Sequence, residues 1–141
     1  MIAYCTHCWR EVNSEDKVCP GCAADLTLDH RTYEEKLIGA LAHPLPEARE
    51  RICWLVGEKQ ILQAVPDVMR LAKDDPDLFV RKAALESLGA LRDPRSALLL
   101  RAISRCENRF LASVAAKSLL AIGHGEAGAS ASETKSGHWR N

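Results

Sequence analysis

Apolar residues recur at helical spacing along the middle of the chain, from residue 33 to residue 122. The first run places its apolar side chains on one face of a helix: Tyr33, Leu37, Ile38 and Leu41. Thr32 stands just before this run and Glu35 follows it closely, which is the pattern of a helix-starting capping box. Prolines interrupt the apolar runs again and again, so we predict a series of short helices.

The helical segments repeat along the sequence. Residues 47–57 align with residues 79–89, and a third copy begins at Phe110, which gives a period of about 30 residues. A period of this length, built from two helices, predicts a solenoid in which each helix pair buries its apolar stripe against the next pair. The few aromatic residues, 5% of the chain, also favour close-packed helices over sheets.

Residues 75–89 carry a nearly complete repeat signature: Asp75-Pro76, Arg81, Ala84 and Leu88-Gly89. This pattern resembles HEAT-like repeats, specifically the short variety also found in phycobilisome lyase proteins. The resemblance covers residues 33–122 and implies a mainly α fold, a short right-handed α-solenoid of HEAT-like helix pairs. The third copy has Ala112 in place of the signature Arg and Leu120 in place of the Gly, so we expect it to be a terminal, capping copy.

Arg49 and Arg81 occupy the same position of their repeats, near the start of a helix. A cation fits poorly with the helix dipole there unless an acid pairs with it. We therefore expect structural ion pairs with acids of adjacent turns, such as Asp74 or Asp77.

Four of the six cysteines form two Cys-x-x-Cys pairs: Cys5, Cys8, Cys19 and Cys22. Two such turns supply the four thiolates that a tetrahedral Zn²⁺ prefers, with backbone amides pointing at the sulfurs. The spacer between the pairs is long enough for a short hairpin that turns at residues 13–16, and Gly21 tolerates the positive φ that a tight metal-binding turn often needs. A segment this short buries too little apolar surface to fold unaided, so a bound metal must supply the stability.

Residues 3–26 resemble the zinc-ribbon or rubredoxin-like knuckle family, in which all four cysteines are metal ligands. The sequence thus predicts a structural Zn²⁺ held by Cys5, Cys8, Cys19 and Cys22. Iron is a less favoured metal for the same ligands, because an all-thiolate tetrahedron does not by itself choose the ion. Two redox-active pairs are a further alternative, which the absence of a βαβ pattern disfavours.

These patterns divide the chain into three segments. Residues 1–28 form the predicted zinc ribbon, and residues 33–122 form the repeat domain. Residues 123–141 are small, polar and aperiodic, and we expect a flexible tail there, because such a composition cannot offset the entropy of ordering.

The charges and apolar runs restrict the partners. The formal net charge is zero, which argues against nucleic acid or an anionic membrane as the main partner. No apolar run approaches the length that spans a bilayer, and no signal peptide is evident, so we expect a cytoplasmic protein. Residues 80–122 carry an excess of basic side chains, and Arg101 and Arg105 are one turn apart, which leaves nucleic-acid binding as an alternative.

No pattern of a catalytic site accompanies these features. Cys53 and Cys106 are isolated in helical segments, and the histidines are scattered without acids at a shared-site spacing. The sequence therefore predicts a non-enzymatic protein–protein interaction module, or scaffold, whose protein partner it does not identify. The resemblance to bilin-attaching lyases supports an enzyme only weakly, since only the repeat is shared.

Two arrangements of the whole chain are open. Either the ribbon docks on the first helix and shields Tyr33, Leu37 and Ile38, or a second copy of the chain closes the open end and makes a homo-oligomer.

Overall fold

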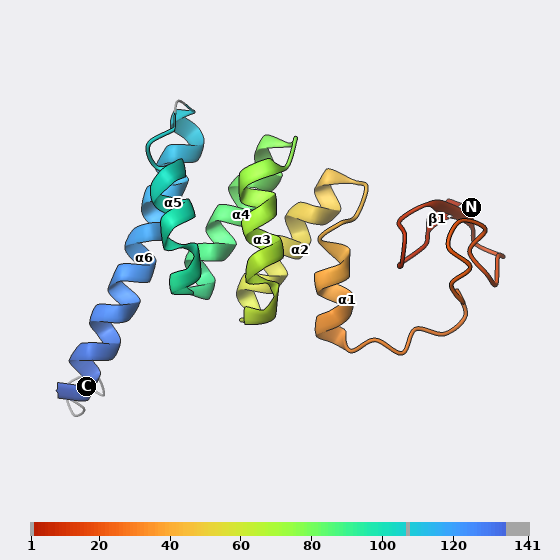
Figure 1. Cartoon of the computed structure of the whole chain (residues 1–141), viewed down its shortest axis with the longest axis horizontal. Helices are drawn as coiled ribbons and strands as arrows, with labels where there is room; N and C mark the ends of the chain where they lie inside the picture. Colours follow the sequence, from red (N-terminus) through yellow and green to blue (C-terminus); the bar gives the residue numbers. More distant parts are fainter. Residues whose placement is uncertain (1, 107, 135–141) are drawn as a thin grey trace.

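The computed structural model describes residues 2–106 and 108–134. It shows a mainly helical chain, as the sequence predicts, with a small N-terminal unit that contains the cysteine pairs (Figure 1). This unit has two strands, β1 (Ile2–Tyr4) and β2 (Glu11–Asn13), which pair antiparallel. The described α-helices are α1 (Tyr33–Ala40), α2 (Pro46–Glu58), α3 (Val65–Asp74), α4 (Leu78–Leu91), α5 (Ala97–Ile103) and α6 (Arg109–Thr134).

The helices stack as successive pairs, which confirms the predicted repeat. Helices α2, α4 and α6 pack side by side in one layer, and α1, α3 and α5 each pack against that layer. Short 3₁₀ turns, Leu62–Ala64 and Pro94–Ser96, lead into α3 and α5. Figure 1 shows the N-terminal unit at one end of this helical stack and the last turns of α6 at the other.

The first helix begins where the capping pattern predicts. The Thr32 side chain accepts a hydrogen bond from the Glu35 amide at 3.2 Å, and the Glu35 carboxylate accepts one from the Thr32 amide at 2.8 Å. Asp77 begins α4 in a similar way, accepting from the amides of Phe79 and Val80. Side-chain oxygens thus satisfy amides that the first turn of a helix leaves without partners.

Glycines set the spacing between neighbouring helices of the α2–α4–α6 layer. A Cβ atom at Gly57 would lie 3.2 Å from Ser87 Oγ, and one at Gly89 would lie 2.8 Å from Ser118 Oγ and 3.0 Å from Ser118 Cα. Leu120 takes the equivalent position on α6 and is 61% exposed, because no further described helix packs there. The third copy is therefore the last of the stack among the described residues.

We expect Gly89→Ala to lower the free energy of unfolding by about 1–2 kcal/mol, because overpacking outweighs the gain in helix propensity. Gly123→Ala is the matched control, since Gly123 lies in α6 and, among the described residues, no atom outside its own stretch of helix lies within 4 Å of an added Cβ. The control should raise the free energy of unfolding by up to about 1 kcal/mol. Urea titrations of both variants measure the difference, and equal stabilisation by both would show that Gly89 is not tightly packed.

An ion pair joins the first two repeats. Arg49 Nε and Nη2 donate to the two carboxylate oxygens of Asp75 at 2.8 and 3.0 Å, and the side chains are only 12% and 3% exposed. Arg49 Nη1 also donates to the carbonyls of His43 and Pro44. The acid is Asp75 rather than the expected Asp74 or Asp77, because Asp75 lies just after α3 ends and is buried against α2.

The matching arginine of the next repeat has no such acid among the contacts the structure describes. Arg81 Nε donates instead to the carbonyl of Ala72 at 3.0 Å, near the end of α3. Of the two expected ion pairs, only that of Arg49 is present. Arg81 instead donates to a carbonyl near the end of α3 and so caps that helix.

The predicted boundary at residue 122 is not the end of regular structure. Helix α6 continues past that boundary to Thr134, and the flexibility expected for the tail stays a prediction. The segment contains several alanines and no proline follows Pro94, so no residue in it forces the helix to stop. The rest of the predicted tail, residues 135–141, lies outside the described residues.

Within the described residues, none of the helices combines the length and the apolar character needed to cross a lipid bilayer.

Candidate metal centre

Two backbone turns of the same geometry bring the four cysteines together. In the first turn the Trp9 amide donates to the Cys5 carbonyl and the Cys5 amide donates to the Arg10 carbonyl, both at 2.9 Å. The second turn repeats these bonds, with Ala23 donating to Cys19 and Cys19 donating to Ala24. The two Cys-x-x-Cys segments are therefore structurally equivalent knuckles. The predicted turn at residues 13–16 is present, since the Asp16 amide donates to the Asn13 carbonyl at 3.0 Å. The spacer does not form a hairpin of its own, because its strand β2 pairs with β1, which precedes the first knuckle.

Each knuckle directs an amide at its first sulfur, as the sequence predicts. The His7 amide donates to Cys5 Sγ at 3.4 Å, and the Gly21 amide donates to Cys19 Sγ at 3.3 Å. Such bonds favour the thiolate form over the thiol. His7 contributes its backbone here, and its side chain is exposed.

The positive φ angles fall elsewhere than expected. They occur at Trp9 and Ala23, which directly follow the second cysteine of each knuckle, and no described glycine has one. A Cβ at Gly21 would lie 2.8 Å from Nε of Arg10, an exposed and flexible side chain that can move away. The expectation of a positive φ at Gly21 is therefore wrong.

The sulfur atoms have the spacing of a metal tetrahedron. Cys5 Sγ lies 3.7 Å from Cys22 Sγ, Cys8 Sγ lies 3.6 Å from Cys19 Sγ, and all four lie within 4.8 Å of one another. A Zn–S bond of about 2.3 Å in a regular tetrahedron places neighbouring sulfurs about 3.8 Å apart. Cys5 and Cys19 are buried and Cys8 and Cys22 are exposed, so the cluster lies at the edge of the N-terminal unit.

Two thiols of the cluster have pKa values shifted in opposite directions. Hydrogen bonds from the Cys22 and Gly21 amides outweigh burial and lower the pKa of Cys19 to about 6. The Ala24 amide lowers the pKa of Cys22, but burial and the neighbouring cysteines outweigh it and raise that pKa to about 12. Four thiolates this close therefore need a cation to be ionised together.

The other two cysteines lie apart from this cluster, as the sequence predicts, but only Cys53 lies in a helix, and the expectation of a helical position for Cys106 is wrong. Cys53 is fully buried in the helical core, where burial raises the pKa of its thiol to about 12. Cys106 is exposed after α5, and its thiol lies 3.5 Å from the Asn108 carbonyl.

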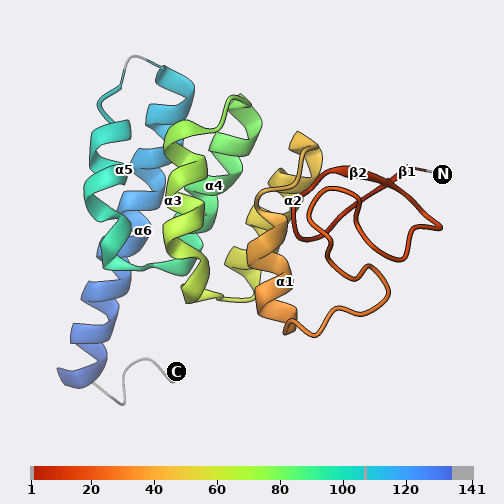
Figure 2. The same cartoon turned by 45° about the vertical axis from the view of Figure 1, so that its right-hand side comes forward.

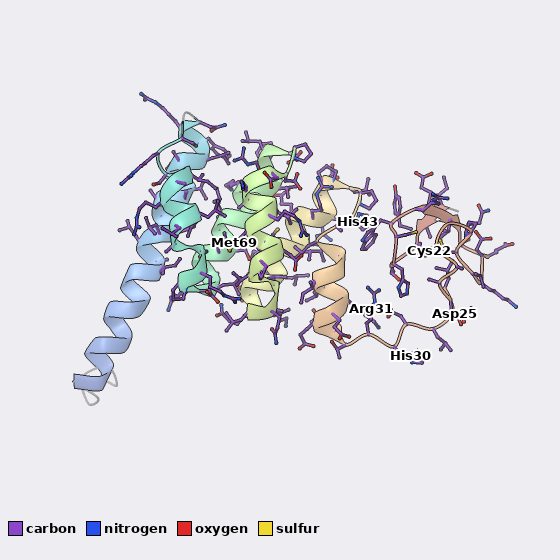
Figure 3. The ribbon with its side chains drawn as sticks, in the orientation of Figure 1. Cys22, Asp25, His30, Arg31, His43 and Met69 are labelled. Carbon is purple, nitrogen blue, oxygen red and sulfur yellow. The ribbon has the colours of Figure 1, made fainter. Side chains whose placement is uncertain are left out.

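One histidine, His43, connects the four-cysteine unit with the helical stack. The His43 ring, in the turn between α1 and α2, lies 5.2 Å from the Tyr4 ring and 4.9 Å from the Trp9 ring, measured between centroids. His43 therefore contacts residues next to Cys5 and Cys8, on the side of the turn that faces the N-terminal unit (Figure 3). The sequence analysis treats His43 as one of several scattered histidines, because its contacts are distant in sequence.

The N-terminal unit does not shield Tyr33, which is 54% exposed. Leu37 is buried within the core of the helical stack instead. Figure 2 shows the unit beside α1 and α2. The N-terminal unit therefore contacts the helical stack through His43 and does not cover the first helix as one of the two expected arrangements has it.

The linker between the two parts is fixed by a second contact. Arg31 donates to both carboxylate oxygens of Asp29, at 2.9 and 2.7 Å, and this hydrogen-bonded pairing holds the pKa of Asp29 well below its usual range. The same guanidinium lies against α1, where a Cβ on Gly39 would be 2.9 Å from Arg31 Nη1. The Arg31 side chain thus lies beside α1 (Figure 3).

We expect the His43 contact to weaken as the pH falls below about 6.5, the ordinary pKa of histidine. Burial, and then the charge of Arg49, lower the pKa of His43 in the folded chain. As the pH falls, a His43 ring that has left the contact therefore binds a proton at a higher pH than a ring that is still in it. His43 Nδ1 also accepts from the Leu45 amide at 3.0 Å, and a proton on Nδ1 removes that bond. The contact is therefore fully stable above that pH and loses stability below it.

The Cε1–H resonance of His43, followed by NMR from about pH 8 to about pH 5, measures this effect. A His43 midpoint above that of a histidine in a short peptide would contradict the prediction.

The basic residues singled out in the sequence lie at the far end of the stack. Arg101 is exposed on α5, and Arg105 is exposed in the turn after that helix, which ends at Ile103. They are therefore not consecutive turns of one helix face as expected. Nucleic-acid binding by this strip is tested by Arg101→Ala and Arg105→Ala, which should lower both the affinity for nucleic acid and its salt dependence.

The repeat pattern has a counterpart in a known family. The profile described as HEAT repeats matches residues 34–120, more than half of the chain. The chain belongs to the HEAT-repeat family. Comparison with curated proteins and with solved structures gave no match.

HEAT repeats commonly mediate protein interactions and are typical of non-catalytic scaffolds. The matched range lies within residues 33–122, the predicted repeat domain, whose boundaries stay a prediction. It covers the HEAT stack from α1 into α6 and leaves the four-cysteine unit outside. The phycobilisome lyase variety stays a prediction.

Proposed function

We propose that this HEAT-repeat protein is a non-enzymatic protein-interaction scaffold whose N-terminal unit is stabilised by a structural Zn²⁺. Cys5, Cys8, Cys19 and Cys22 would hold the ion. Four thiolates complete its coordination and leave no position for a reactive water, so the ion would supply stability rather than chemistry.

Two observations support the metal. The sulfur separations of 3.6 and 3.7 Å fit a zinc tetrahedron, and knuckle amides donate to Cys5 and Cys19. The unit's own core is also very small, since only Cys5, Val12 and Cys19 are buried in it.

The observation that carries the interaction role is the exposure of large apolar side chains on a well-packed stack. Leu98 is 76% exposed and Trp54 and Leu120 are each 61% exposed, although the core beneath them is filled. Exposed aromatic and aliphatic side chains of this size are the usual anchors of protein interfaces. A repeat stack presents them on a surface long enough to hold a partner.

Partner capture tests the proposal. The zinc-loaded chain is immobilised, exposed to an extract of its source cells and cross-linked, and retained proteins are identified by mass spectrometry. The matched control carries Trp54→Ser, Leu98→Ser and Leu120→Ser, which change exposed side chains only and should leave the helical melting curve intact. We expect a stoichiometric partner that the control loses, whereas equal retention by both baits would overturn the proposal.

A further inference from the structure

A groove runs along the surface between α2 and α4, around Trp54. Its wider part is a hollow of about 400 Å³, lined by Glu47, Glu50, Arg51, Trp54, Ala83 and Glu86. A narrower hollow of about 110 Å³ shares Trp54, Ala83 and Glu86 and continues toward the ends of the helices. We call these two hollows together the Trp54 groove.

Helix α2 supplies one wall of the groove through a single face. Glu47, Glu50, Trp54 and Glu58 follow one another at helical spacing, and all four are exposed. Glu86 on α4 is the repeat equivalent of Trp54 on α2. Both side chains line the groove, so an acid from α4 faces the indole from α2.

The groove is acidic. Four carboxylates line it, from Glu47, Glu50, Glu58 and Glu86, against the single lining cation Arg51. Lys82 pairs with Glu86 at 3.2 Å and offsets part of this charge, but both side chains are well exposed. A net negative surface around an exposed indole attracts a cation to the ring face.

A buried hydroxyl forms part of the narrow hollow. Ser87 is 3% exposed, and its Oγ has no hydrogen-bond partner among the described residues. The equivalent serine of the next helix pair, Ser118, donates to the Leu85 carbonyl at 2.7 Å. Gly57 packs closely beside this serine, since a Cβ on it would lie 3.2 Å from Ser87 Oγ, so the narrow hollow that Ser87 lines is the route by which a polar group can reach the unpaired oxygen.

We propose that the Trp54 groove binds an arginine-containing basic segment of a partner protein. A guanidinium stacks on the Trp54 indole and donates to the carboxylates of Glu50 and Glu86, because a planar cation satisfies the ring and the acids together. A polar group of the same segment bonds Ser87 Oγ. This assignment rests on the proposed scaffold function and names the surface and the chemistry of its partner.

Titration with a labelled arginine-rich peptide tests the assignment on the full, zinc-loaded chain at low salt. Peptides of the same length with glutamine or glutamate in place of arginine are the comparison probes. The chain has three tryptophans, so Trp9 and Trp139 give reference indole N–H resonances for Trp54 in ¹H–¹⁵N spectra. We expect the Trp54 indole signal to shift with the arginine peptide and not with the other two.

Substitutions separate the groove from general charge attraction. Trp54→Ala should weaken the arginine peptide about tenfold, and Glu50→Gln or Glu86→Gln should each weaken it by up to about fivefold. Glu15→Gln makes the same charge change on an exposed residue of the four-cysteine unit and should have little effect. Equal weakening by Glu15→Gln and Glu50→Gln, or binding of the glutamine peptide with similar affinity, would overturn the assignment.

Ser87→Ala gives an independent readout. It should weaken the peptide while leaving the melting temperature unchanged or higher, because the hydroxyl has no partner to lose. Unchanged affinity in this variant would remove Ser87 from the site. Self-association of the chain that Trp54→Ala abolishes would show that a second copy occupies the groove, and would also overturn the assignment.

The two proposals fail differently. If Trp54→Ala alone captures the same cellular partner as the native chain, the groove assignment is wrong and the scaffold function stands. If neither an arginine peptide nor any cellular protein is retained, both are wrong.

Discussion

Cys19→Ser is expected to abolish metal binding and to unfold residues 2–26. Cys19 is 1% exposed and is one of three buried residues of that unit, so losing its thiolate removes both a ligand and part of the core. Structural zinc contributes about 10–16 kcal/mol in small peptide sites, far more than so few apolar contacts supply. Elemental analysis should find one zinc per native chain and none in the variant, and amide spectra should lose their dispersion in residues 2–26.

The helices should largely survive this substitution. The helical core forms a separate cluster that includes no residue of the four-cysteine unit, and the His43 contact is the main link between the two parts. We expect the helical melting temperature to fall by only a few degrees, the effect of about 1 kcal/mol in a domain of this size.

Cys106→Ser is the matched control, because Cys106 is an exposed cysteine outside the cluster. It should keep the metal and the dispersed spectrum. Retention of zinc by Cys19→Ser would contradict the proposed ligand set, and helices that melt together with the unit would show that the metal supports the whole fold. Iron in place of zinc in the native chain would keep the site and change the ion.

The features predictable from sequence are those set by residues close together in the chain. The capping box of Thr32 and Glu35 needs only one helical turn, and each Cys-x-x-Cys knuckle is closed by bonds within six residues, such as that from Cys5 to Arg10. The repeat predicts which helices pack together because each copy meets its neighbour in the same way.

The features that were missed depend on which side chains meet across the fold. The sequence offers Asp74, Asp75 and Asp77 to Arg49, and only the burial of the α3–α4 turn selects Asp75. His43 reaches Tyr4 and Trp9 across a long sequence separation, for which no local pattern exists. Trp54 stands where the next repeat has Glu86, and that difference is the one signal of the groove visible in the sequence.

Arg49→Met is expected to lower the free energy of unfolding of the helical stack by about 3–5 kcal/mol, because it leaves Asp75 charged, buried and unpaired. The substitution keeps much of the length of the side chain, so the loss is of charge and hydrogen bonds. It also leaves the carbonyls of His43 and Pro44 without their donor. Urea denaturation followed by circular dichroism measures the change.

Arg95→Met is the matched control for this experiment. Arg95 makes the same kind of pair with Asp93 at 2.8 Å, but its side chain is 57% exposed, so its removal should cost no more than about 1 kcal/mol. Similar losses in the two variants would show that burial does not decide the strength of these pairs.

The double variant Arg49→Met, Asp75→Leu separates the cost of a lone charge from the worth of the pair. Replacing both members of a buried pair by apolar residues is often nearly neutral, so most of the lost stability should return. Full recovery is not expected, since Asp75 also accepts from the Asp77 amide at 2.9 Å at the start of α4. If the double variant is as unstable as Arg49→Met, the lost stability comes from the ion pair itself and not from the cost of leaving the Asp75 carboxylate unpaired.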